Sequence, residues 1–404
     1  MGRNKKNIIF TIVSVIVVLV FIVLFLFYKN NANVLNDFFD KFAKEEVETV
    51  QNLETEVETL EKIDDETRYI RYLKASDDFV KIGTRDKKDV FCFAGDIFFS
   101  NRVQSAYDEQ GIDGVLDVSY RNVLKNADLS VGNLECCITD NVETPEDKTW
   151  TFALPTRYID GIKDADIDLL TLANNHILDY GMTALADTIE ALDLHGVAHI
   201  GAADNIYDAK KVYIKEIEGK RYAILAASAV LPNDFWKATD EHGGVYNGYN
   251  ASGIAAEIDL LKTYVDKVIV YMHWGVELDE VSNDYQKTAA RRMIDAGADL
   301  IIGTHPHVVQ EVEYYKGAPI VYSLGNFIYG GQVRDIIMVE ATFDYSENEN
   351  GNLTIKLMPG VSNYQKTKRY WNDDLVFRLE GINAKSRNCK IESDGTVVEE
   401  INME

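Results

Sequence analysis

The sequence predicts an α/β protein in which helices cover the faces of sheets, and two observations support this fold class. From Asp89 onward, short apolar runs of strand length alternate with amphipathic patterns of helical period. Apolar residues make up 46% of the 404-residue chain and aromatic residues 11%, which is the composition of a packed globular protein. The chain is long enough for one large domain or two ordinary ones.

Residues 1–30 are predicted to be a cytoplasmic stub and a transmembrane anchor. Residues 8–28 form an uncharged apolar run of the roughly 20 residues that a bilayer requires, and Arg3, Lys5 and Lys6 precede it. The run ends in Leu-Phe-Tyr-Lys without the small residues of a signal cleavage site, so we expect the anchor to be retained. This predicts a single-pass protein of the cell membrane, with a cytoplasmic N-terminus and an extracellular main domain.

Residues 31–86 are predicted to form an acidic helical stalk. Val50, Leu53, Val57 and Leu60 follow a short heptad pattern among many glutamates. Two heptads do not establish a coiled coil, so two alternatives stay open. The segment could associate with a second copy of itself, or pack as an amphipathic helix on the main domain.

Residues 87–335 carry the alternation of strands and helices that defines the main domain. Amphipathic patterns predict helices near 182–195 and 285–296. Strand-like runs cover 90–95, 129–135, 167–174, a hairpin at 211–228 with its turn at Glu218-Gly219-Lys220, 268–274, 299–305 and 319–327. Residues 336–404 are predicted to form a hairpin extension around Asn350-Gly351, followed from about 365 by an edge strand and a loose tail.

Charge and cysteine content exclude two classes of protein. The formal net charge of −25 argues against nucleic acid as a partner, because phosphates require a basic surface. The cysteines are too few for a disulfide scaffold and show no CxxC spacing, which argues against a zinc knuckle; they are Cys92, Cys136, Cys137 and Cys389. Pairing of Cys92 with Cys136 or Cys137 stays open.

Polar side chains follow five of the predicted strands at the points where the apolar runs end. They are Asp96, Glu135, the run Asn174-Asn175-His176, His273, and the pair His305 and His307. A single histidine at a strand end is usually structural, but the carboxyl ends of strands in α/β sheets converge on one crevice. Imidazole and carboxylate together suit zinc, manganese or iron. The sequence therefore predicts a divalent metal site at this edge.

The triplet His305-Pro306-His307 is the most specific of these signals. In an extended segment, residues two apart point the same way, so both imidazoles are expected to face one pocket. The proline between them is expected to stiffen the turn and to fix the geometry of the two rings before a metal arrives.

At these residues the sequence resembles the CapA family of poly-γ-glutamate capsule synthesis proteins. The resemblance rests on AGDIFFSNR, VGNLECCIT, LANNHILDYG, HWGVE, GTHPHVVQ and YSLGNF, which follow one another in the family's order over residues 89–335. It implies a calcineurin-like metallophosphoesterase sandwich, in which two facing mixed sheets are flanked by helices. It also implies a cofactor of one or two divalent ions, Zn, Mn or Fe.

The resemblance further implies ligands for each ion. Asp96 and His307 would serve one metal, and Glu135 would take the place of the bridging carboxylate. The second metal would be completed by Asn175, His273 and His305. Typical metallophosphoesterases begin with Asp-x-His, whereas Ile97 and Phe98 follow Asp96 here, so the first metal has one ligand fewer.

Roles around the metal follow from the same resemblance. His176 resembles the general acid of the superfamily, and Asp179 would orient its ring. Arg102 would donate two hydrogen bonds to a carboxylate or phosphate, unless it is an ordinary surface arginine. Trp274 would wall the pocket, unless it is packed in the core. Ser323 and Asn326 are expected to hold the 305–307 loop through hydrogen bonds.

Three functions are compatible with this sequence. The first is a metal-dependent hydrolase in the biosynthesis or export of an anionic envelope polymer, either poly-γ-glutamate or a similar chain. It would act on the polymer or its precursor, and the family resemblance implies membrane synthase subunits as further partners. The second is a non-catalytic accessory subunit that binds the polymer. The third is a generic metallophosphoesterase, which the missing Asp-x-His histidine disfavours.

Overall fold

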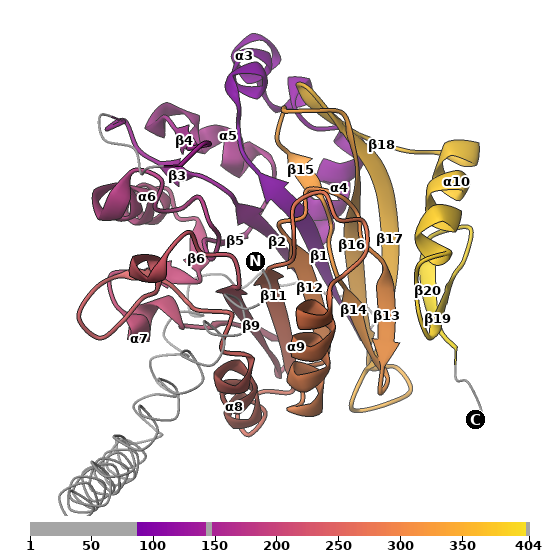
Figure 1. The fold of residues 1–404 in the computed structure, drawn as a ribbon. Coiled ribbons are helices and arrows are strands. Elements are labelled where there is room, and N and C mark those ends of the chain that lie inside the picture. The colour runs from indigo at the N-terminus through magenta and orange to yellow at the C-terminus, as the bar shows by residue number, and fades with distance from the viewer. Residues whose placement is uncertain (1–86, 143–147, 401–404) are drawn as a thin grey trace, which may run out of the picture. The chain divides into compact units, whose positions relative to one another are not determined.

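The computed structural model describes residues 87–142 and 148–400 (Figure 1). The anchor predicted at residues 1–30 and the stalk predicted at 31–86 lie outside the described residues. Within the described part of the chain, no helix has both the length and the apolar character needed to cross a bilayer.

A ten-stranded mixed sheet forms one layer of the fold. Its order is β19 (Cys389–Ile391), β20 (Thr396–Glu399), β17 (Asn352–Asn363), β16 (Arg334–Asp344), β1 (Lys88–Ile97), β2 (Leu129–Leu134), β5 (Leu169–Thr171) and β6 (Ala198–Ile200), with β15 (Asn326–Ile328) on β1 and β18 (Lys366–Arg369) on β17. The strands β1, β2, β5 and β6 run parallel, whereas β16 is antiparallel to β1. The hairpin expected after residue 335 is therefore part of the main sheet.

A six-stranded mixed sheet forms the second layer. Its order is β13 (Val312–Tyr315), β14 (Ala318–Val321), β12 (Leu300–Thr304), β11 (Lys267–His273), β9 (Lys220–Ser228) and β8 (Tyr213–Ile217). The predicted β8–β9 hairpin is confirmed, because Ile217 pairs with Lys220 across a two-residue turn. Glu218 and Gly219 in this turn have φ values of 48° and 82°, the backbone that a tight hairpin requires.

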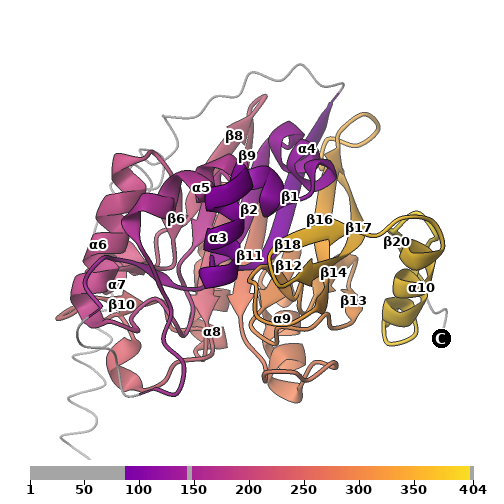
Figure 2. The ribbon, with the colours of Figure 1, turned by 90° about the horizontal axis from the view of Figure 1, so that it is seen from above.

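Helices pack around the two sheets. They are α3 (Asn101–Gln110), α4 (Val118–Asn126), α5 (Ile159–Asp164), α6 (Gly181–Leu194), α7 (Ile206–Ala209), α8 (Ala251–Leu261), α9 (Asp284–Asp295) and α10 (Asn372–Asn383). The predicted helices are confirmed by α6 and α9, and α9 begins with a capping box formed by Asn283 and Gln286. Figure 2 shows α6 and α10 at opposite ends of the molecule.

The region after residue 365 differs from the expected edge strand and loose tail. It contains β18, the helix α10 and the hairpin β19–β20, which joins the ten-stranded sheet through β17. The helix was not expected because its apolar face is narrow, with Leu379 and Ile382 as its buried residues.

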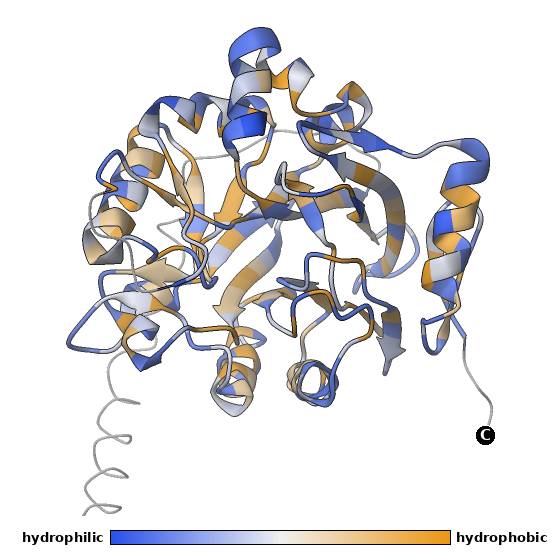
Figure 3. Cartoon of the chain, turned by 45° about the horizontal axis from the view of Figure 1, so that its top comes forward, coloured by the Kyte–Doolittle hydropathy of each residue, from blue (hydrophilic) through white to orange (hydrophobic). Residues whose placement is uncertain are grey.

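One hydrophobic core lies between the two sheets, and a second lies between the six-stranded sheet and its helices. Side chains along a strand alternate between the two faces of its sheet, so one strand contributes to both cores. In β9, Tyr222 and Ile224 pack in the core shared by both sheets, whereas Ala223 and Leu225 pack on the other face with α8 and α9. The rings of Phe91 in β1 and Tyr222 lie 4.6 Å apart across the interface. Figure 3 shows the hydrophobic colour concentrated on these central strands. The expectation of an α/β fold is therefore confirmed for the described residues.

At the edge where the parallel strands end, β1 closely approaches the segment that leads from β14 into β15. The amide of Asp96 donates to the Gly325 carbonyl at 3.1 Å. A Cβ atom on Gly95 would lie 1.9 Å from that same carbonyl oxygen, so glycine is required for this approach. All four cysteines are buried free thiols, and Cys92 is therefore not paired with Cys136 or Cys137.

Candidate metal centre

The six residues predicted as metal ligands come together at this edge, although the chain brings them from different strands. Asp96 is the second-last residue of β1, and Glu135 directly follows β2. Asn175 follows β5, and His273 ends β11. The two remaining imidazoles, His305 and His307, follow β12.

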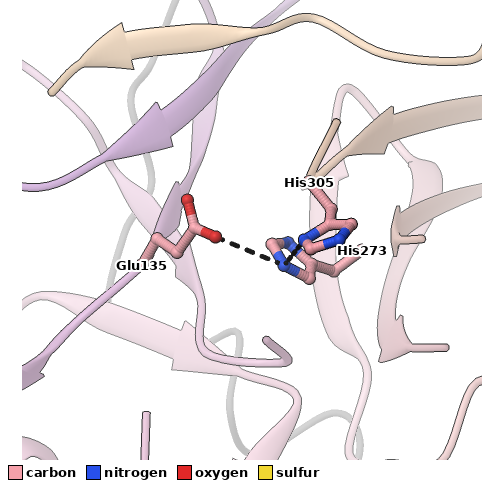
Figure 4. Close-up of side chains that lie close together, drawn as sticks. All are labelled: Glu135, His273 and His305. Atoms are coloured by element: carbon pink, nitrogen blue, oxygen red, sulfur yellow. Dashed lines mark hydrogen bonds and ion pairs between the residues drawn. The ribbon is translucent and has the colours of Figure 1, made fainter. Parts of the chain in front are cut away.

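The donor atoms fall into two groups that share one carboxylate. Glu135, His273 and His305 form one group, and Asp96, Glu135 and His307 form the other, with the donor atoms of each group within 4.8 Å of one another. Figure 4 shows the Glu135 carboxylate directed toward the His273 and His305 rings. This grouping is the one that the family resemblance implies, with Glu135 in the bridging place.

Glu135 is the central residue of the cluster and the most unusual one electrostatically. Its side chain is fully buried, and neither carboxylate oxygen has a hydrogen-bond partner. Burial and the neighbouring Asp96 carboxylate raise the pKa of Glu135 well above its usual range. Imidazole nitrogens of His273 and His307 lie 3.4 and 3.8 Å from its carboxylate oxygens. A buried carboxylate that makes no hydrogen bond is costly unless positive charge compensates it, so this residue fits a metal ligand.

His273 is the central residue of the group that it forms with Glu135 and His305. Its Nε2 atom lies 2.8 Å from Asn175 Oδ1, 3.1 Å from His305 Nδ1 and 3.4 Å from Glu135 Oε1. One ring hydrogen of His273 can serve only one of these three atoms, whereas a cation would interact favourably with all of their lone pairs. Burial lowers the pKa of His273 and of His305 well below the usual range, which disfavours extra protons. A cation therefore fits this arrangement.

The loop that carries the two histidines is not extended, contrary to expectation. His305 and His307 have φ values of 95° and 58°, in the left-handed region that non-glycine residues rarely adopt. Both rings reach the cluster because of this turned backbone, and the His305 amide also lies 3.3 Å from Asp96 Oδ2. Strain of this kind is typical of functional sites, since packing around them must maintain it.

His307 belongs to the group around Asp96. Its Nδ1 atom lies 2.7 Å from Asn326 Oδ1, 3.5 Å from Asp96 Oδ2 and 3.8 Å from Glu135 Oε2. Burial by itself would lower the pKa of His307, but the Glu135 and Asp96 carboxylates outweigh burial and raise it to about 10. Ser323 Oγ accepts from the Gly325 amide at 3.3 Å, so it holds the turn before Asn326.

His176 and Asp179 lie beside the cluster in the relation that was expected of them. His176 Nδ1 is 2.6 Å from Asp179 Oδ2, and both side chains are almost fully buried. Burial lowers the pKa of His176, and the hydrogen bond with Asp179 partly offsets that effect. The amide of His176 donates to Asn174 Oδ1 at 2.9 Å, which fixes the position of this residue after β5.

The two residues proposed to contact substrate have different environments. Trp274 is fully buried in the core between the six-stranded sheet and its helices, and its indole N–H donates to the Tyr322 carbonyl at 2.9 Å. It follows His273 in the chain and so faces the other side of the sheet, which makes it a core residue and not a pocket wall. Arg102 is exposed on α3, with its guanidinium 4.8 Å from the centre of the Tyr364 ring.

Sequence reasoning missed Asn133 and Lys148. Asn133 Nδ2 donates to Asp96 Oδ1 at 2.8 Å and lies 3.3 Å from His273 Nδ1. An amide inside a wholly buried strand is a signal that could have identified it, because buried polar groups need partners. Lys148 Nζ donates to Asp179 and to the Asn175 carbonyl, and nothing in its sequence context indicates this contact.

Aromatic rings line the cluster on the side of His176 and His307. Phe152 stacks on the His176 ring at 4.2 Å and on Phe98 at 4.5 Å, and Tyr329 lies 5.0 Å from the His307 ring. Phe98 occupies the position where an Asp-x-His motif would place a histidine. The group formed by Asp96, Glu135 and His307 therefore has an aromatic ring where a typical metallophosphoesterase has a further ligand.

The fold and the site together define a class: an α/β sandwich with a buried carboxylate–imidazole cluster where the parallel strands end. Three imidazoles, two carboxylates and an amide oxygen are a donor set that suits divalent transition metals. The chain belongs to the family described as bacterial capsule synthesis protein PGA_cap, whose model matches residues 90–330. The resemblance to the CapA family is thereby confirmed.

Similar proteins agree with this assignment. The chain is 30% identical over 287 residues to the capsule biosynthesis protein CapA of Bacillus anthracis, with 68% of this chain and 67% of that protein covered. It is 31% identical over 272 residues to the PGA biosynthesis protein CapA of Bacillus subtilis (strain 168), with 66% and 70% covered. Among solved structures, a 5'-nucleotidase from Candida albicans SC5314 shares 13% identity at a TM-score of 0.40, with 68% and 52% covered. The family assignment rests on the sequence comparisons.

Proposed function

We propose that this chain is a membrane-anchored extracellular protein that uses a divalent metal centre to hydrolyse poly-γ-glutamate, or a similar anionic envelope polymer, during capsule synthesis and export. Membership of the capsule synthesis family supports the capsule role. The metal centre is proposed because Glu135 belongs to both groups of donors and neither of its two buried oxygens has a hydrogen-bond partner.

The residues divide the chemistry between them. Asp96, Glu135 and His307 would hold one ion, and Asn175, His273 and His305 would hold a second one together with Glu135. A divalent ion such as zinc, manganese or iron supplies Lewis acidity and lowers the pKa of bound water. His176, oriented by Asp179, lies beside this cluster and could donate a proton to a leaving group.

Elemental analysis and a turnover assay test the metal centre. The purified full chain should contain one or two transition-metal ions, and Glu135→Ala should lose most of them. Wild-type protein should shorten poly-γ-glutamate in a metal-dependent way, whereas a chelator should stop this reaction. A chain that holds no transition metal and shows no metal-stimulated turnover would contradict the proposal.

A non-catalytic polymer-binding subunit of a membrane synthase is the second candidate. The observation that favours it is Phe98, which stacks on Phe152 where a typical metallophosphoesterase has a ligand histidine. Polymer production by cells that carry His176→Ala separates the two functions, since only the hydrolase requires a proton donor. Undiminished polymer in that variant, with loss in His305→Ala, would favour the accessory function.

The anchor is proposed from residues 8–28, and its test concerns location alone. The full chain should stay with the membrane fraction after an alkaline wash, and a variant without residues 1–30 should be released. Protease added outside spheroplasts should degrade the main domain. Protection of that domain until the membrane is lysed would contradict an extracellular location.

A further inference from the structure

Lys148 contacts the segment that follows β5 at two separate points. Its Nζ atom donates to the backbone carbonyl of Asn175 and to the Asp179 carboxylate, and lies 3.4 Å from His176 Nδ1. The ammonium also lies 4.9 Å from the centre of the buried Trp236 ring, in a cation–π contact. The Asn175 carbonyl, the Asp179 carboxylate and the Trp236 ring together surround the ammonium. Lys148 is therefore arranged to hold protein groups and not to bind substrate.

Phe152, four residues further along, holds the same segment from the backbone. Its amide donates to Asp179 Oδ2 at 2.7 Å, and its ring stacks on the His176 ring with a centroid distance of 4.2 Å and an interplanar angle of 26°. One Asp179 oxygen thus serves Lys148, and the other serves both Phe152 and His176. This carboxylate is fully buried, so each of these partners compensates for its loss of water.

The held segment leads directly into the proposed metal cluster. Asn175 Oδ1 lies 2.8 Å from His273 Nε2, so rotation of the Asn175 backbone would move this oxygen away from the other donors. The carbonyl that Lys148 fixes belongs to the same residue. Groups that orient metal ligands in this way typically change metal affinity by about 10–100-fold when they are removed.

We propose that Lys148 and Phe152 form a clamp that positions Asn175 and His176 at the metal cluster, with Lys148 as a positioning residue for the ligand set. The inference rests on the proposed function, because it requires that the cluster bind a metal. The clamp acts through the Asn175 carbonyl and the Asp179 carboxylate. Its removal should therefore change how tightly, and in which geometry, a metal is held.

Cobalt binding by the full chain in mild detergent tests the clamp, with Co²⁺ alone as the probe. Lys148→Met should bind Co²⁺ about 10–100-fold more weakly than wild type and should change the visible absorption bands, which report coordination geometry. Lys148→Arg keeps donors near both acceptors and should recover most of the affinity. Wild-type affinity and spectrum in Lys148→Met, or no recovery in Lys148→Arg, would overturn the clamp.

Two controls separate the clamp from a general loss of folding. Lys316→Met removes an exposed lysine that pairs with Asp295 and should leave Co²⁺ binding unchanged. In an Asn175→Ala background, Lys148→Met should add little further loss, because the ligand that the clamp positions is already gone. If Lys148→Met does not fold, Lys148→Gln takes its place. An intermediate loss of affinity supports the clamp there, and wild-type affinity overturns it.

The wild-type titration separates the two proposals. If wild-type protein binds no Co²⁺, the metal centre is wrong and the clamp has no ligand set to position. If wild-type protein binds Co²⁺ and Lys148→Met binds it equally well, the metal centre stands and only the clamp is wrong.

Discussion

At the scale of single residues, the cluster combines acidic and imidazole groups that cannot all satisfy one another. Glu135 has no hydrogen-bond partner, and three polar atoms surround His273 Nε2. Burial lowers the pKa of His273 and of His305, which leaves both rings neutral and able to bind a metal. Glu135 and His307 have raised pKa values, so each must lose a proton when a metal binds. A buried set of this kind is unfavourable by itself and becomes favourable when a cation joins it.

The substitution Glu135→Gln tests this balance. Without metal, the variant should be more stable than wild type by about 1–2 kcal/mol, because a buried carboxylate without partners is replaced by a neutral amide. With metal, it should lose affinity by at least about 100-fold, since a ligand is lost. Thermal unfolding with and without chelator measures both effects. A metal-free variant that melts below wild type would contradict the prediction.

A second prediction at the scale of residues concerns Asp89, which lies at the opposite end of β1 from Asp96. Its hydrogen bond with Tyr222 of β9 connects the two sheets. Its carboxylate accepts a hydrogen bond from the Tyr222 hydroxyl, which also lies 2.7 Å from the Tyr345 hydroxyl. Burial raises the pKa of Asp89 from 3.8 to about 6, although the Tyr222 hydrogen bond lowers it in part. The folded protein therefore retains this proton to a higher pH than the unfolded chain.

The sign of the pH dependence follows from that shift. Stability contributed by protonated Asp89 is fully present below about pH 3.8 and is lost as the pH rises through about 6. Asp89→Asn removes this component, so the difference in unfolding free energy between variant and wild type should change between those values. Denaturant unfolding at pH 4, 5, 6 and 7 measures it. A difference that is constant over this range would rule out the shift.

At the scale of elements, the site depends on the close approach of β1 to the segment that leads into β15. Asp96 pairs with Asn326 in parallel register, and its amide donates to Gly325. The same pairing brings Asp96 close to His307, because Asn326 pairs with Asp96 and also contacts His307 Nδ1. Gly95 permits this approach, since any side chain there would overlap the Gly325 carbonyl.

Gly95→Ala should therefore damage both the fold and the metal centre. The added Cβ would lie 1.9 Å from backbone, which cannot give way as a flexible side chain could. We expect a loss of more than about 3 kcal/mol in unfolding free energy. Gly381→Ala is the matched control, because this glycine lies within α10 with open space around it and should gain about 0.5–1 kcal/mol. Equal melting temperatures for the two variants would contradict the argument.

At the scale of the whole molecule, the C-terminal strands complete the main sheet. β16 pairs with β1 over six residues, and β17 pairs with β16 along its length. Val339 and Phe343 of β16 are fully buried in the core between the sheets. The sheet that holds Asp96 and Glu135 thus depends on residues that follow the family match at 90–330.

A truncation after residue 335 should consequently fail to fold. It would expose the edge of β1 and remove part of the core that both sheets share. A chain that ends after residue 371 keeps β16, β17 and β18 and should remain folded with lower stability, because it lacks only α10 and the last hairpin. Circular dichroism and thermal unfolding distinguish the two. A folded, cooperative chain that ends at residue 335 would show that β16 is dispensable.

The sequence by itself determined the features that depend on neighbours in the chain. Apolar runs gave the strands β1, β2, β11 and β12 and the positions where they end, because alternation and burial are local patterns. The ends of these four strands and of β5 supplied the six donor residues. The strands belong to two sheets, and their carboxyl ends meet at one edge. Motif spacing identified the family, which the comparison confirms.

The tertiary structure decided what depends on contacts between distant residues. Strand order placed β16 beside β1. The packing of α8 and α9 on the six-stranded sheet made Trp274 a core residue, whereas His273 faces the cluster. The left-handed backbone at His305 and His307, and the contacts of Lys148 with Asn175, have no local signal. They arise because buried polar groups must find partners wherever the packed chain supplies them, and a linear sequence does not contain that information.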